Sequence, residues 1–96
     1  MADGNARTVS KIGVIGAGAM GRGIAQVAAQ GGMDVVLIDT KPGVADEAKA
    51  FIDTMFGRLV EKDKMTAAEK AEAVGRIQAR AEIAGLEDAD LVIEAV

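Results

Sequence analysis

The 96-residue chain contains neither cysteine nor histidine, and these two absences remove much of the chemistry that a protein can perform. Without them there is no disulfide, no thiol nucleophile, no imidazole base and no zinc site of the usual ligand types. The single serine, Ser10, precedes the first predicted strand, so no Ser-His-Asp arrangement can be drawn. The sequence therefore predicts no catalytic residue and no metal site.

Aromatic residues and long apolar runs are also scarce. Half of the residues are hydrophobic but only Phe51 and Phe56 are aromatic, which predicts a core of aliphatic side chains. No run reaches the roughly 18 apolar residues of a membrane span, and the first ten residues lack the apolar core of a secretory signal. The net charge is −4 without a basic cluster, which argues against a nucleic-acid partner. We expect a cytoplasmic protein, because the lack of cysteine fits a reducing compartment.

Apolar runs with strand periodicity alternate with runs of helical periodicity. The expected strands cover residues 11–15, 35–38, 77–83 and 91–96, and the expected helices 20–30, 40–59 and 66–74. This alternation predicts an α/β fold with a doubly wound parallel sheet of the Rossmann type, in strand order 3-2-1-4. A helical hairpin is expected between strands 2 and 3. The domain is predicted over residues 11–96, incomplete at its C-terminus, and residues 1–10 form an N-terminal tail.

Several residues are expected to pack inside this domain. On the long second helix, Val44, Ala48, Phe51, Met55 and Leu59 form one apolar stripe. Met20 and Phe56 are also expected in the core. Gly23 is expected to let the first helix pack closely against the sheet.

The most informative motif is the glycine-rich run Gly16-Ala17-Gly18-Ala19-Met20-Gly21, which follows the first strand and opens the first helix. In the G-x-G-x-x-G pattern the first glycine permits a tight turn and the second admits a diphosphate to the backbone. The third glycine allows close packing of helix and strand, and the helix N-terminus attracts the anion. A tight turn without a ligand stays open as the alternative.

An acidic residue, Asp39, ends the second strand eighteen residues after Gly21. This is close to the spacing of about 20 residues at which such folds place a ribose-binding acid. A carboxylate there repels a 2′-phosphate, which favours NAD over NADP, although nearby Lys41 softens the repulsion. The alternative is a strand-end acid that caps the following helix.

Two segments resemble the 3-hydroxyacyl-CoA dehydrogenases: Lys11–Gln26, which matches the start of that family, and Asp90–Val96, which matches its fourth strand. The resemblance covers residues 11–96. It implies a homodimeric parent enzyme that oxidises 3-hydroxyacyl-CoA to 3-oxoacyl-CoA with NAD in fatty-acid or related acyl-CoA metabolism. The cofactor-binding residues expected from motif and resemblance are Gly16, Ala17, Gly18, Ala19, Met20, Gly21, Asp39, Ala95 and Val96.

The resemblance also implies what this chain lacks. A lysine with which the family helps to bind CoA falls on Lys62, but Met55 stands where the family has a serine. The catalytic histidine with its glutamate partner follows later in the family's sequence, so we expect an N-terminal fragment without activity of its own. Both 3-hydroxybutyryl-CoA and 3-hydroxyadipyl-CoA are open as parent substrates. A stand-alone module that binds or senses NAD(H) without catalysis is the alternative function.

Overall fold

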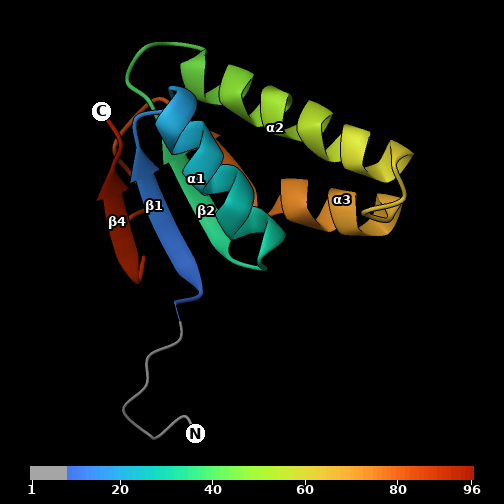
Figure 1. Ribbon diagram of the computed structural model, residues 1–96. Coiled ribbons are helices and arrows are strands. Elements are labelled where there is room, and N and C mark those ends of the chain that lie inside the picture. The colour runs from blue at the N-terminus through green and yellow to red at the C-terminus, as the bar shows by residue number, and fades with distance from the viewer. Residues whose placement is uncertain (1–8) are drawn as a thin grey trace, which may run out of the picture.

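The computed structural model describes residues 9–96, which form one parallel sheet with helices packed on it (Figure 1). Along the chain the elements are β1 (Lys11–Ile15), α1 (Ala19–Gln30), β2 (Asp34–Ile38), α2 (Val44–Glu61), α3 (Ala67–Gly75), β3 (Ile77–Arg80) and β4 (Leu91–Glu94). The strands lie in the order β3-β2-β1-β4. This order and the hairpin of α2 and α3 between the second and third strands confirm the predicted Rossmann-type fold.

Strand β1 lies between β2 and β4, and the predicted site is at the ends of these three strands. Its last residue, Ile15, stands opposite Ile38 of β2 and Glu94 of β4. The carboxyl ends of these three strands therefore meet at one edge, the upper edge in Figure 1, where α1 begins. Parallel α/β sheets bind ligands outside this edge, at the point where the strand order reverses.

The core is aliphatic apart from Phe56, which is fully buried as predicted. Because alternate residues of a strand point to opposite faces, Leu37 points to one side of the sheet and Val36 and Ile38 to the other. All three are at most 1% exposed, so β2 is covered on both faces. The largest fully buried side chains are Phe56, Leu37, Ile38, Ile52, Ile77, Val14, Val35 and Val36.

The helix boundaries follow from local signals in the sequence. The predicted capping box is present at α3: the Glu69 N–H donates to Thr66 Oγ1 at 3.0 Å, and Glu69 Oε1 accepts from the Thr66 N–H at 2.8 Å. Helix α2 begins at Val44, later than predicted. The preceding Gly43 has a φ of +83°, a left-handed conformation that a helix cannot continue through.

Two predictions of buried side chains are wrong. On α2 the buried residues are Ala45, Ala48, Ile52 and Phe56, and the predicted Val44 and Leu59 are partly buried against the core. Ala48 and Phe56 are thus buried as predicted, whereas Phe51 is 41% exposed. On α1, Met20 is 61% exposed. Both errors arise because each helix carries apolar residues on more than one face. The elements that pack against the helix then determine which face is buried.

Two further predictions about local structure are wrong. Strand β3 ends at Arg80 because its partner β2 ends at Ile38, which stands opposite Arg80, and Ile83 beyond it is exposed. Gly23 does not pack on the sheet, since a Cβ atom at this position would meet nothing within 4 Å. The predicted tail lies mostly outside the described residues, but Ser10 is bonded through its N–H and hydroxyl to Asp90 Oδ2.

An apolar groove of about 800 Å³ runs between α1 and β4. Exposed side chains at its rim include Met20, Val27 and Leu91, and polar side chains are absent from its described lining. Within residues 9–96, no helix is both long and apolar enough to cross a membrane.

Candidate functional site

The glycine loop between β1 and α1 forms a cradle of backbone at the carboxyl edge of the sheet. Gly16 turns the chain off β1 with a φ of +104°, and its N–H donates to the carbonyl of Ile38 at 2.7 Å. Gly18 is the N-cap of α1 and contributes no side-chain cap. Since the first N–H groups of a helix lack partners within the helix, this end of α1 offers donors and a positive dipole to an anion.

The three motif glycines have different roles. A Cβ atom on Gly21 would collide with the Gly16 carbonyl oxygen and would lie 2.9 Å from the Gly16 carbonyl carbon. A Cβ atom on Gly16 would lie 2.7 Å from the Ala95 carbonyl oxygen. At Gly18 the added atom would meet nothing within 4 Å. Packing therefore requires Gly16 and Gly21, whereas Gly18 leaves open space in front of the helix terminus.

Asp39 lies beside this cradle, one residue beyond the end of β2. Its Oδ2 accepts a hydrogen bond from the Ala17 N–H at 3.0 Å, and its Oδ1 accepts one from the Lys41 N–H at 3.0 Å. The bond from Ala17 is the main cause that lowers the pKa of this carboxyl, helped by the bond from Lys41 and by the charge of the Lys41 ammonium. Asp39 is therefore an ionised acceptor at the position predicted for a ribose ligand.

The bond between Asp39 and Ala17 is expected to persist in weak acid. Because the folded-state pKa of Asp39 lies below 3.8, its stabilising contribution is present above that pH and is lost as the pH falls through the lowered pKa. The NMR shift of the Ala17 amide proton should titrate with a midpoint below 3.8. The shift should not titrate in Asp39→Asn, and a midpoint at or above 3.8 in the wild type would contradict the bond.

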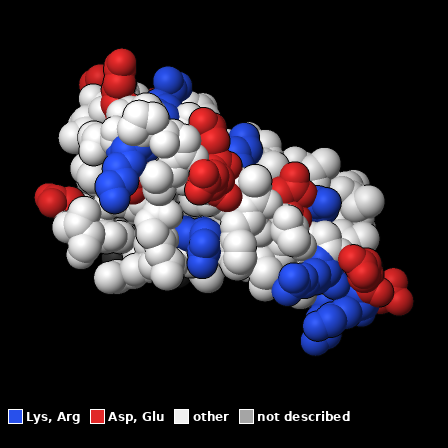
Figure 2. Space-filling model, turned by 90° about the horizontal axis from the view of Figure 1, so that it is seen from above, with Lys and Arg blue, Asp and Glu red and all other residues white. Residues whose placement is uncertain are grey.

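The remaining predicted cofactor residues lie around the same edge. Ala95 is buried and its N–H donates to the Ile15 carbonyl at 2.8 Å, which continues the pairing of β4 with β1. Met20 and Val96 are exposed, at 61% and 94%. Figure 2 looks down on this edge and shows acidic and basic side chains interspersed among uncharged ones. The structure thus brings the loop, Asp39 and the end of β4 together, and their contact with a cofactor stays a prediction.

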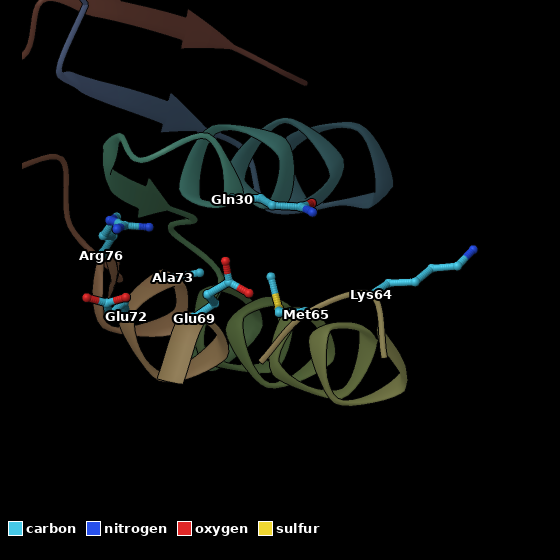
Figure 3. Close-up of a pocket in the computed structure, with 7 residues that line it drawn as sticks. All are labelled: Gln30, Lys64, Met65, Glu69, Glu72, Ala73 and Arg76. Carbon is cyan, nitrogen blue, oxygen red and sulfur yellow. The ribbon is translucent and has the colours of Figure 1, made fainter. Parts of the chain in front are cut away.

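Lys62 lies away from this group. It follows directly after α2, whose 18 residues span about 27 Å at 1.5 Å per residue, and α2 begins near the Asp39 end of the sheet. A concavity of about 270 Å³ opens nearby between α3 and the C-terminal end of α1 (Figure 3). Figure 3 shows Glu69 of α3 and Gln30 of α1 across from each other, with Lys64 extending away. This concavity lies at the opposite end of α1 from the glycine loop.

One contact near the loop carries no signal in the sequence. The guanidinium carbon of Arg22 lies 3.7 Å from the centre of the Phe51 ring, a cation–π contact between α1 and α2. The contact gives the Phe51 ring a packing partner on α1 although the side chain is 41% exposed. No periodicity or motif connects residues 22 and 51, so only the packing of the two helices shows the pair.

Fold and site together define a dinucleotide-binding domain of the Rossmann type. Residues 11–96 match the family described as 3-hydroxyacyl-CoA dehydrogenase, NAD binding domain. The chain belongs to this family, and NAD is the cofactor of the domain.

Individual relatives agree with this assignment. The chain is 49% identical over 86 residues to "Probable 3-hydroxybutyryl-CoA dehydrogenase" of Deinococcus radiodurans, covering 90% of this chain and 31% of the relative. It is 36% identical over 92 residues to the fatty acid oxidation complex subunit alpha of a Psychrobacter species, covering 96% and 13%. The crystal structure of (S)-3-hydroxybutyryl-CoA dehydrogenase from Ralstonia eutropha superposes with a TM-score of 0.87 at 37% identity, covering 93% and 31%. The chain thus spans less than a third of the length of these relatives.

Proposed function

We propose that this chain holds the diphosphate and adenosine ribose of NAD at the carboxyl edge of its sheet. The diphosphate lies against the backbone at Gly18, where no Cβ atom intrudes, and accepts hydrogen bonds from the first turn of α1. Asp39 accepts from the ribose hydroxyls, and the backbone of Ala95 and Val96 lines the groove. The observation that carries this proposal is the open space at Gly18 beside an ionised Asp39.

For the whole protein we infer the oxidation of a 3-hydroxyacyl-CoA to a 3-oxoacyl-CoA, with hydride transfer to NAD, by a cytoplasmic homodimer. The names of two relatives support 3-hydroxybutyryl-CoA as the substrate class. The reaction needs a general base near the hydroxyl, and the catalytic histidine that the family resemblance implies is not among these 96 residues. The proposal therefore assigns cofactor binding to this chain, with Lys62 as a CoA contact, and assigns the base to another part of the enzyme.

Cofactor choice tests the role of Asp39. We expect NAD to bind at least about tenfold more tightly than NADP, because a carboxylate facing the 2′ position repels a phosphate there. Calorimetric titration of the chain with both cofactors measures the ratio. Asp39→Ser should reduce the ratio of the NADP to the NAD dissociation constant. The matched control Asp34→Ser, at the other end of β2, should leave this ratio unchanged. Equal or tighter binding of NADP to the wild-type chain would refute the assignment.

A further inference from the structure

The carboxylate of Asp39 joins two loops of the cofactor-binding edge. The residue itself follows β2, its Oδ2 holds the Ala17 N–H in the loop between β1 and α1, and its Oδ1 holds the Lys41 N–H in the loop between β2 and α2. The Ala17 bond spans 22 positions of the sequence. Asp39 is thus connected to the glycine loop independently of any ligand.

The glycine loop needs such a connection. Gly16 and Gly18 flank Ala17, and glycine loses more conformational freedom on ordering than any other residue. Gly18 also provides no side-chain cap for α1. One backbone bond, from the Gly16 N–H to Ile38, ties the start of the loop to β2. The Asp39 carboxylate adds a second tie at the next residue, and a charged acceptor makes the stronger kind of hydrogen bond.

We propose that Asp39 is a positioning residue for the phosphate-binding loop: through the Ala17 N–H it holds the loop in the conformation that receives the diphosphate. This proposal rests on the proposed function, since it takes the loop to be the diphosphate site. An ionised carboxylate has about four acceptor positions. The two backbone donors therefore leave capacity for the ribose hydroxyls, so one side chain serves both the ribose and, through the loop, the diphosphate.

The first test measures the loop without cofactor. Hydrogen exchange of the Ala17 amide, followed by NMR, should accelerate about tenfold or more in Asp39→Ala, because the amide loses its acceptor. The exchange rate in Asp39→Asn should lie between those of the wild type and Asp39→Ala, since the asparagine amide oxygen can accept one of the two hydrogen bonds. Asp34→Asn, at the opposite end of β2 from Asp39, is the matched control and should leave the Ala17 exchange rate unchanged. Circular dichroism checks that each variant is folded.

The second test uses inorganic pyrophosphate, which has no ribose. If Asp39 served the ribose alone, removing its negative charge would leave the affinity for pyrophosphate unchanged or raise it. The proposal expects the opposite: the dissociation constant, measured by NMR titration, should rise about threefold or more in Asp39→Ala because the loop is no longer held in place.

The two tests separate the proposal from the function on which it rests. Unchanged Ala17 exchange in folded Asp39→Ala overturns the positioning role, even if NAD binding is lost. Faster exchange with unchanged or tighter pyrophosphate binding also overturns it, because the ordered loop would then not matter for the diphosphate. Faster Ala17 exchange in Asp39→Ala, combined with no pyrophosphate binding by the wild-type chain, supports the tie between Asp39 and the loop but refutes the diphosphate site itself.

Discussion

Replacing Gly21 with alanine is expected to destabilise the fold by about 3 kcal/mol or more, which is a large part of the 5–15 kcal/mol typical of a domain. The added Cβ atom would overlap the carbonyl oxygen of Gly16 and press on Val14 at 3.3 Å. The backbone at Gly16 cannot shift away from α1 without cost. Its N–H is bonded to the Ile38 carbonyl, and it lies so close to Ala95 that even a Cβ atom on Gly16 would not fit between them. Chemical denaturation measures the loss as a lower midpoint.

Gly23→Ala provides the matched control for this experiment. It places the same atom two residues further along α1, where nothing lies within 4 Å. Because glycine in a helix interior costs roughly 0.5–1 kcal/mol relative to alanine, this variant should be as stable as the wild type or more so. Equal stability of Gly21→Ala and Gly23→Ala would contradict the close approach of α1 to the glycine loop.

The fold could be predicted because its signals are local. The β1–loop–α1 unit is marked by an apolar run and three spaced glycines, and the α3 start by a capping box, so each specifies its element without help from distant residues. The order of the strands then follows from the topology rules of parallel sheets. The place of Asp39 beside the glycine loop could be predicted for the same reason, since it follows a strand at a characteristic distance from Gly21, and its contact with the ribose stays a prediction.

The errors lie where distant residues decide. Helix α2 carries the neighbouring apolar pairs Phe51–Ile52 and Met55–Phe56, which permit two buried stripes about 100° apart. The sequence does not choose between them, and the packing in the fold buries Ile52 and Phe56. The bond from Ala17 to Asp39 was missed because a side chain that meets a backbone group 22 residues away leaves no periodic trace.

Replacing Gly18 with valine is expected to separate binding from folding. Gly18 has a φ of −74° and a ψ of −166°, an extended conformation that valine adopts readily, and its Cβ position is open. The branched side chain would therefore fit the fold but would occupy the space proposed for the diphosphate. We expect the dissociation constant of NAD to rise on the order of a hundredfold, about 2.7 kcal/mol, measured by calorimetric titration.

Gly75→Val is the matched control for this substitution, since Gly75 ends α3, far along the chain from the loop, and a Cβ atom there also meets nothing within 4 Å. It should bind NAD like the wild type. Circular dichroism and the denaturation midpoint of Gly18→Val should stay close to those of the control, which assigns the loss to the site and not to unfolding. If a folded Gly18→Val chain binds NAD with undiminished affinity, the diphosphate does not lie against this helix terminus, and the cofactor must reach the domain through another surface.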